Sequence, residues 1–272
     1  MENGYAPTAL NEALHLLSTN QLTPYAGGTD LMIEENRAGS YLFLHNIPEL
    51  KHVRLDDAHV CFGAGCTFTE LLENELTPEL LKKALRQIAA PAIRNEGTIG
   101  GNIANGSAKA DTALICFVTD SKLRIASSRG ERIIPIKTFY KGRKQLDIAP
   151  DELIVEVLMP RKWLDSYYYQ KIGARKSLAI SRLSFAGLMT IENWKIAHCA
   201  TAYGAVSDVI LRREDIDAML IGKTIAQAKA EKEAYLKAFD EAIVPIRGRV
   251  SAEYRKDVCL GLLREFLNQF GI

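Results

Sequence analysis

The sequence predicts an α+β protein made of three units: two small lobes, then an antiparallel sheet accompanied by helices. Two glycine-rich loops, each preceded by a strand-like stretch, organise the first two units. Downstream, long strand patterns give way to helical periodicity, which marks the third unit. With 272 residues, of which 47% are apolar and 25% charged, the chain is long enough for two globular domains.

The near-equal numbers of basic and acidic residues limit the kinds of molecule that this protein is expected to bind. The formal net charge is +1, so nothing favours a nucleic acid or a membrane surface. The first twenty residues lack a basic segment followed by an apolar one, and no stretch approaches the ~20 apolar residues of a membrane span. We therefore expect a cytoplasmic protein that acts on small molecules or on other proteins.

Cysteine and histidine spacing gives no sign of a metal centre. The five cysteines form neither an even disulfide set nor a ligand cluster, and Cys61 and Cys66 lack the further cysteines of a plant-type iron–sulfur motif. The five histidines show no metal-binding spacing. We expect reduced, mostly buried thiols and no metal site.

Residues 1–52 are expected to form the first lobe. Apolar residues at helical spacing predict a helix near the N-terminus, from Ala9 to Leu17. A strand over 23–26 then leads into the first glycine loop, Tyr25-Ala26-Gly27-Gly28-Thr29-Asp30-Leu31. Asp30 can cap a short helix over 31–37, and a strand over 41–44 completes a βαβ-like unit.

Residues 53–163 are expected to form the second lobe. Strands over 53–55 and 60–62 run into Gly63-Ala64-Gly65, which resembles the start of a dinucleotide-binding fingerprint. The third glycine of that fingerprint is replaced by Phe68, however, and no acidic residue closes the unit convincingly. A capping box of Thr67 and Glu70 at a helix start explains the segment better.

The second glycine loop is Thr98-Ile99-Gly100-Gly101-Asn102-Ile103-Ala104-Asn105-Gly106-Ser107. A helix over 78–90 with Ile88 on its inner face precedes the loop, and a helix over 113–118, capped by Asp111, follows it. Strands over 123–126, 133–136 and 153–159 complete the lobe. Paired glycines among short hydroxyl and amide side chains suit a phosphate, so the two loops together could hold one pyrophosphate.

Residues 164–272 are expected to form the third unit, after a break at 160–165. Strand patterns cover 167–171, 183–191 and 194–203, and helical spacing covers 213–220, 225–239 and 252–270. The sequence thus predicts a three-stranded antiparallel sheet with a helical bundle, and a domain boundary between residues 163 and 164.

Three segments together resemble one known family. The first glycine loop, then Arg94-Asn95-Glu96-Gly97-Thr98-Ile99-Gly100-Gly101-Asn102-Ile103-Ala104, then Ala179-Ile180-Ser181-Arg182 are similar to the FAD-binding medium subunit of molybdenum hydroxylases, which include the xanthine, carbon monoxide and nicotinate dehydrogenases. The resemblance covers essentially the whole chain. It implies a two-lobed FAD-binding domain of the PCMH type, like that of vanillyl-alcohol oxidase, followed by the C-terminal domain of these flavoproteins.

The resemblance also implies a cofactor site, position by position. The two loops would hold the pyrophosphate and ribityl chain, Asp111 would face the flavin end, and Ile88, Ile154 and Lys171 would line the isoalloxazine; an exposed strand lysine is the alternative for Lys171. The implied FAD contacts are Tyr25, Ala26, Gly27, Gly28, Thr29, Asp30, Leu31, Ile88, Thr98, Gly100, Gly101, Asn102, Asn105, Asp111, Ile154 and Lys171. Neither loop contains histidine or cysteine, so we expect FAD to be held non-covalently.

The function of the family implies that this chain takes part in electron transfer between subunits. A molybdopterin-binding large subunit would oxidise the substrate, a [2Fe–2S] small subunit would carry electrons, and this chain would pass them through FAD to NAD, in a heterotrimer. Xanthine is the favoured substrate, and nicotinate, carbon monoxide or another N-heterocycle are alternatives. A stand-alone FAD oxidase would need its own substrate cavity, and a FAD-free scaffold would have no use for two intact glycine loops.

Overall fold

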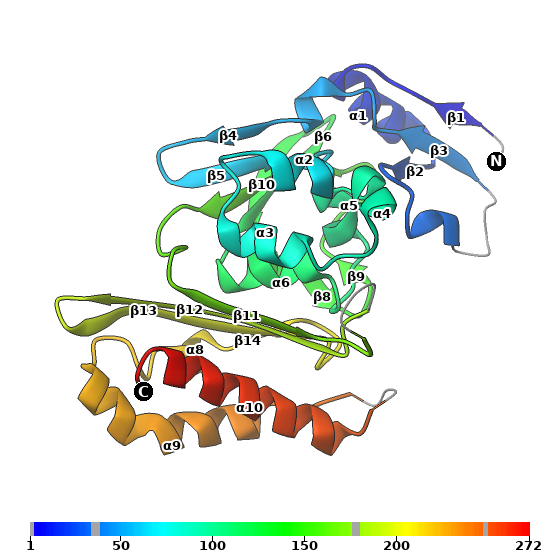
Figure 1. Ribbon diagram of the computed structural model, residues 1–272. Coiled ribbons are helices and arrows are strands. Elements are labelled where there is room, and N and C mark those ends of the chain that lie inside the picture. Colours follow the sequence, from blue (N-terminus) through cyan, green and yellow to red (C-terminus); the bar gives the residue numbers. More distant parts are fainter. Residues whose placement is uncertain (1–2, 34–38, 176–179, 247–249) are drawn as a thin grey trace. The chain divides into compact units, whose positions relative to one another are not determined.

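A computed structural model describes residues 3–33, 39–175, 180–246 and 250–272 (Figure 1). The chain divides into two compact units. The first unit comprises Met1–Pro78, Ile88–Ser107 and Asp120–Arg161, and the second comprises Glu79–Gln87, Ala108–Thr119 and Lys162–Ile272. Glu79–Gln87 and Ala108–Thr119 therefore belong to the second unit, although the chain before and after each of them belongs to the first. No local pattern in the sequence indicates this division.

The first unit begins with a small parallel sheet. Strands β1 (Gly4–Tyr5) and β2 (Leu22–Tyr25) both pair with β3 (Ser40–Phe43). Helix α1 (Leu10–Thr19) buries Ala13, Leu14 and Leu17, the face that the apolar spacing predicts. The predicted helix over 31–37 is described only as a 3₁₀ turn, η1 (Leu31–Ile33), because residues 34–38 lie outside the described residues.

A five-stranded antiparallel sheet forms the second part of this unit. Its order is β4 (Val53–Leu55), β5 (His59–Gly63), β10 (Leu153–Pro160), β6 (Lys122–Ser127) and β7 (Gly130–Pro135). Ala126, Leu153 and Val155 of this sheet share a buried apolar cluster with α1 and with Leu42 of the small sheet. One apolar core therefore joins the two predicted lobes.

Short elements connect these sheets. A 3₁₀ turn, η2 (Pro48–Leu50), precedes β4, and helix α7 (Ile136–Phe139) precedes the hairpin of β8 (Tyr140–Gly142) and β9 (Gln145–Leu146). Helix α2 (Phe68–Glu73) begins with the predicted capping box, because the Thr67 side chain accepts from the Glu70 N–H and the Glu70 carboxylate accepts from the Thr67 N–H. Strand β5 pairs only with antiparallel neighbours, so the dinucleotide-binding interpretation of residues 63–68 is wrong.

The helix predicted over 78–90 is shorter in the structure. Helix α3 (Glu79–Leu85) ends before Ile88, and Ala89 has a positive φ of 40°, which breaks the helix. The Arg94 guanidinium donates to the carbonyls of Ile88 and Ala89, each at 2.8 Å. Pro91 then opens a separate helix, α4 (Pro91–Glu96), because proline suits the first turn of a helix.

The second unit contains a four-stranded antiparallel sheet, where the sequence predicted three strands. Strands β11 (Tyr167–Ile172), β12 (Leu183–Glu192) and β13 (Lys195–Gly204) match the prediction, and β14 (Leu211–Arg212) adds to β13. Two residues are too few to show an alternating pattern. The helix predicted over 213–220 is a single turn, α8 (Glu214–Asp217).

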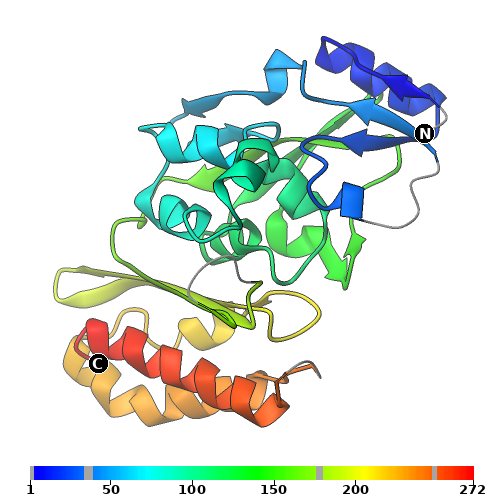
Figure 2. The same ribbon diagram turned by 45° about the vertical axis from the view of Figure 1, so that its right-hand side comes forward.

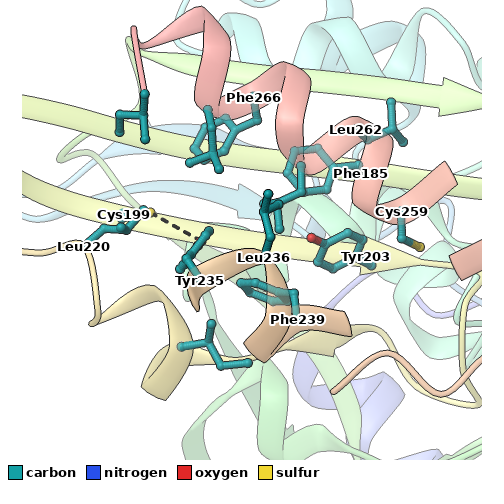
Figure 3. Close-up of a cluster of buried hydrophobic side chains, with 14 of the residues drawn as sticks. Phe185, Cys199, Tyr203, Leu220, Tyr235, Leu236, Phe239, Cys259, Leu262 and Phe266 are labelled. Atoms are coloured by element: carbon teal, nitrogen blue, oxygen red, sulfur yellow. Dashed lines mark hydrogen bonds between the residues drawn. The ribbon is translucent and has the colours of Figure 1, made fainter. Parts of the chain in front are cut away.

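Helices cover both faces of this sheet. Helices α9 (Ile225–Ala242) and α10 (Ala252–Gln269) lie side by side along one face, and α6 (Asp111–Val118) packs on β12 and β13 from the other (Figures 1 and 2). Between the sheet and α9 and α10, buried aromatic side chains form a network of edge-to-face and tilted contacts that includes Phe185, Tyr203, Phe239 and Phe266 (Figure 3). Tyr168 and Ile172 of β11 pack against this core, which fixes the strand that carries Tyr169 and Lys171.

Two further properties concern the whole described chain. All five cysteines are buried and free of disulfide bonds. No helix among the described residues is both long and apolar enough to cross a membrane.

Candidate functional site

Both glycine loops line one cavity of about 540 Å³ in the first unit. Apolar side chains such as Pro24, Leu44 and Phe68 form part of its wall, and polar loop residues form the rest. Twelve predicted site residues line this cavity: Ala26, Gly27, Gly28, Thr29, Asp30, Leu31, Thr98, Gly100, Gly101, Asn102, Asn105 and Ile154. The fold therefore brings together loops that are more than sixty residues apart in sequence.

The first loop is narrow and specifically requires glycine. Gly28 has a backbone φ of +66°, which residues other than glycine rarely adopt. A Cβ on Gly27 would lie 1.8 Å from the carbonyl oxygen of Glu96, so the first loop touches the backbone that leads into the second. The close approach of these two segments brings one loop beside the other.

The N–H groups of this loop are available to a ligand. Within the described parts of the chain, the backbone N–H groups of Ala26, Gly27, Gly28 and Thr29 donate to no protein acceptor. A run of N–H groups beside a concave wall is an arrangement that binds anionic oxygens. The geometry therefore suits a phosphate or diphosphate, as the sequence predicts.

The second loop is helical rather than an open turn. Gly100 and Gly101 lie inside α5 (Ile99–Ala104), whose N-cap Thr98 accepts from the Gly101 N–H at 3.0 Å. The Gly100 N–H donates to the Ala64 carbonyl at 2.9 Å, which holds α5 against the 63–65 segment. A Cβ on Gly101 would meet only Thr98 Oγ1 at 2.9 Å and Ala26 Cβ at 4.0 Å, so the rest of that position is open.

A side-chain hydrogen bond joins the two loops. Asn105, the C-cap of α5, donates its Nδ2 to Asp30 Oδ2 at 2.8 Å. Asp30 was predicted to cap the following helix. Most of that helix lies outside the described residues, so the capping role stays a prediction, and the described contact of the Asp30 carboxylate is with the second loop.

The sequence did not reveal the wall formed by residues 146–154. Leu146, Ile148, Ala149, Pro150, Glu152 and Leu153 all line the cavity, together with the predicted Ile154. Residues 147–150 belong to neither a helix nor a strand, so they show no periodicity. Ala64 and Gly65 also line the cavity, and the Gly-x-Gly segment around them was the only available signal.

Four predicted site residues do not line the cavity. Tyr25 packs its ring on Tyr41 and Phe43, with ring centroids 5.9 and 5.1 Å apart. Ile88 lies in the turn between α3 and α4. Asp111 and Lys171 belong to the second unit, where they contact each other.

The carboxylate of Asp111 is the centre of a buried polar cluster in the second unit. Lys171 Nζ lies 2.7 Å from Asp111 Oδ2 and also donates to the Gln87 carbonyl at 2.9 Å. Ser181 Oγ donates to Asp111 Oδ1 at 3.0 Å. Burial raises the pKa of Asp111, and the Lys171 ammonium and the hydrogen bonds oppose that shift.

The Lys171 side chain is 7% exposed, so the alternative of an exposed strand lysine is wrong. Its ammonium has a carboxylate and a carbonyl as partners, and the charge is largely compensated within the second unit. Within the described ranges, no group of three His, Cys, Asp or Glu residues is placed to hold a metal ion.

Comparisons with known proteins agree with this geometry. A model of the family described as "FAD binding domain in molybdopterin dehydrogenase" matches residues 2–162, and one described as "CO dehydrogenase flavoprotein C-terminal domain" matches 167–270. A xanthine dehydrogenase FAD-binding subunit of Escherichia coli O157:H7 is 33% identical over 215 residues, which cover 75% of this chain and 73% of that protein. A nicotinate dehydrogenase FAD-subunit of Eubacterium barkeri is 28% identical, covering 96% of this chain and 93% of that protein.

Among solved structures, a chain of carbon monoxide dehydrogenase from Hydrogenophaga pseudoflava matches with a TM-score of 0.89 and 25% identity, covering 98% of this chain and 96% of that one. The predicted α+β fold class is therefore confirmed, with a fourth strand in the C-terminal sheet as the correction. The matched ranges, the glycine-loop cavity and this likeness lead to one conclusion: the chain belongs to the family of FAD-binding subunits of molybdenum hydroxylases.

Proposed function

We propose that this chain holds FAD in the cavity between its glycine loops and serves as the electron-transfer subunit of a molybdenum hydroxylase complex. The single observation that carries the proposal is the row of N–H groups at Ala26–Thr29 that have no acceptor among the described residues and lie in a partly apolar cavity of about 540 Å³. These features fit a dinucleotide, which has a diphosphate between two larger, partly apolar ends.

The chain's own residues have distinct parts in this proposal. The backbone N–H groups of the first loop would donate to the diphosphate oxygens, and Asn102 and Asn105 line the same cavity. Ile154 and the 146–150 wall exclude water from the apolar portion. No histidine or cysteine is among the described residues that line the cavity, which agrees with non-covalent binding. FAD supplies two-electron storage and one-electron exchange when it is bound.

The FAD-binding roles of the four predicted site residues that do not line the cavity stay predictions. Tyr25 supports the first loop from β2, and we infer that Ile88, Asp111 and Lys171 serve the flavin end. A carboxylate paired with an ammonium is close to neutral as a unit. The pair can therefore fix hydrogen-bond geometry with little net electrostatic effect. The predicted domain boundary between residues 163 and 164 also stays a prediction.

The relay requires partners. We infer that a molybdopterin-binding large subunit and a [2Fe–2S] small subunit deliver electrons to this chain, with NAD as acceptor, in a cytoplasmic complex. Xanthine is the first candidate substrate because the xanthine dehydrogenase relative is 33% identical. Nicotinate is the second candidate, since that relative matches over 96% of this chain.

The first test of this function uses the isolated full-length chain. Purified protein should be yellow, with one FAD per chain that is released by acid or denaturant, and it should not oxidise xanthine or nicotinate on its own. Co-expression with candidate large and small subunits should give one complex by size-exclusion chromatography and restore substrate-dependent NAD reduction.

Two results would replace the proposal. A colourless chain that also fails to take up added FAD would support the scaffold alternative. Oxidation of a substrate by the isolated chain, with oxygen or a dye as acceptor, would support the stand-alone oxidase.

A further inference from the structure

Arg132 is outside the cavity, yet its guanidinium contacts the segment that forms the cavity wall. It lies on β7, the edge strand of the five-stranded sheet, opposite Ile125 of β6. Its Nε donates to Glu152 Oε1 at 2.9 Å and its NH2 donates to Glu152 Oε2 at 2.8 Å. This bidentate geometry is the strong form of the arginine–carboxylate pair.

The same guanidinium also holds the beginning of the wall. Arg132 NH2 donates to the Asp147 carbonyl at 2.6 Å, and NH1 donates to Asp147 Oδ2 at 3.3 Å. All three nitrogens of the guanidinium are therefore directed at residues 147 and 152, the two ends of an irregular segment. A lysine at this position could not reproduce these contacts, because its single ammonium group lacks the several coplanar N–H donors of a guanidinium.

Glu152 transmits this contact to the middle of the wall. Its Oε2 accepts from the Ala149 N–H at 2.8 Å, and its own N–H donates to the Ala149 carbonyl at 3.0 Å. The Glu152 side chain is only 11% exposed, and the hydrogen bonds from Arg132 lower the pKa of its carboxyl. Glu152 is thus ionised and fixed at neutral pH.

Apart from these contacts, the Asp147 carboxylate lies 3.9 Å from the exposed Lys141 ammonium. Residues 147–150 belong to no helix or strand, and the Asp147 N–H bond to the Phe139 carbonyl, at 2.8 Å, is their one remaining backbone contact in the described chain. Yet Leu146, Ile148, Ala149 and Pro150 all line the cavity. Leu146 is held by its pairing with Tyr140 in the β8–β9 hairpin, whereas residues 148–150 depend on the contacts made by Arg132 and Glu152.

We propose that Arg132 and Glu152 are positioning residues that hold the 146–150 wall and thereby set the affinity of the cavity for FAD. This inference depends on the proposed function, since it assumes that the cavity holds FAD. Supporting contacts of this type commonly change ligand affinity by about 10- to 100-fold where they orient a binding group.

A second arginine on the same β6–β7 hairpin, Arg129, provides a matched control. Arg129 pairs with Asp151, the residue before Glu152, through a bidentate contact, but the Arg129 side chain is 64% exposed and neither residue lines the cavity. Arg129→Met removes the same charge and a similar ion pair, but it removes none of the hydrogen bonds that hold residues 147, 149 and 152. It therefore separates loss of an arginine from loss of wall support.

The experiment is FAD titration of full-length apoprotein, followed by flavin fluorescence and by visible circular dichroism of the bound flavin. We expect Arg132→Met and Glu152→Gln each to raise the Kd for FAD about 10- to 100-fold and to change the dichroism of the flavin bound at saturation. Arg132→Lys should recover only part of the affinity. Arg129→Met should stay within about twofold of the wild type.

Wild-type affinity and dichroism in both Arg132→Met and Glu152→Gln would overturn the inference, as would an equal loss in Arg129→Met. Thermal unfolding of each apoprotein by far-UV circular dichroism identifies a variant that does not fold. If Arg132→Met fails this check, Arg132→Lys and Glu152→Gln decide together, because Arg132 does not line the cavity and Glu152→Gln preserves side-chain volume and an acceptor for Ala149. A wild-type protein that takes up no FAD contradicts the proposed function instead, so the two failures are distinguishable.

Discussion

Asn105 and Asp30 are 75 residues apart in sequence, both line the candidate FAD cavity, and Asn105 Nδ2 donates to Asp30 Oδ2 at 2.8 Å. Asp30 ends the first glycine loop, and Asn105 caps the helix that contains the second pair of glycines. The hydrogen bond therefore spans the two predicted lobes. Its removal tests whether FAD binding depends on the spacing of the loops.

Asn105→Ala should weaken FAD binding about tenfold and lower the free energy of unfolding by about 1 kcal/mol, because a single partly exposed hydrogen bond is worth that much. Equilibrium titration and urea denaturation measure the two effects. Asn20→Ala is the control, since Asn20 Nδ2 makes a comparable exposed hydrogen bond to the Leu16 carbonyl at 3.0 Å and Asn20 lines neither cavity beside the glycine loops. Equal affinities in the two variants would show that the bond between the loops is irrelevant to FAD.

Gly101→Val should abolish FAD binding while leaving much of the fold intact. A Cβ at this position meets Thr98 Oγ1 at 2.9 Å, and the added methyl groups of valine would extend into the cavity or break the N-cap. Flavin absorbance after purification and far-UV circular dichroism give the result. Gly261→Val in α10, where nothing lies within 4 Å of the added Cβ, should retain FAD. A yellow Gly101→Val protein with full occupancy would contradict the role of the second loop.

Lys171→Met should destabilise the second unit by about 3–5 kcal/mol, because it leaves the buried Asp111 carboxylate without its cation. Adding Asp111→Asn should recover part of that loss, since the unpaired charge is then gone. The free energies of unfolding of the four proteins form a double-mutant cycle. Lys83→Met removes an exposed ammonium above the Tyr167 ring and should cost less than about 1 kcal/mol. Additive effects of the two substitutions would mean that the pair is not coupled.

The same Lys171→Met variant should leave FAD bound and shift its reduction potential only modestly downward. A cation near the flavin would favour the anionic reduced form, but the Asp111 carboxylate already compensates this ammonium. Spectroelectrochemistry of the bound flavin measures the shift. A large shift would mean that the ammonium acts on the flavin without compensation.

The stability of the second unit should depend on His198 between pH 6.5 and 4. His198 stacks on Trp163, with ring centroids 4.3 Å apart, and burial, helped by Arg212 and Lys162, lowers its pKa from 6.5 to about 4. The unfolded chain therefore binds the proton first, and the stabilisation present above pH 6.5 is lost as the pH falls toward 4. After discounting for solvent screening, the contribution is about 1–2 kcal/mol.

Urea denaturation of the wild type and of His198→Gln across this pH range isolates the effect. Asp217, whose pKa is raised by burial to about 6, contributes with the opposite sign, because its stabilisation is lost as the pH rises from about 4 to 6. Only the difference between the two proteins therefore reports on His198. Parallel pH profiles would show that the imidazole does not titrate with folding.

Much of the local structure could be predicted from the sequence, because it depends on short-range patterns. Apolar spacing identified the buried face of α1, and the capping box of Thr67 and Glu70 fixed the start of α2. The long strands β12 and β13 were recognisable for the same reason, whereas the two residues of β14 were not. Gly28 has a positive φ that its residue type alone makes plausible.

Only the tertiary structure decided which of these segments meet. The pair of Lys171 and Asp111, the bond from Asn105 to Asp30 and the fork of Arg132 on Glu152 each join residues that no periodicity relates. The sequence determined the two glycine loops, because glycine is needed locally wherever backbone must turn sharply or approach closely. It could not determine the wall at 147–150, because that segment belongs to no helix or strand and is held by the side chains of Arg132 and Glu152, which folding brings to it.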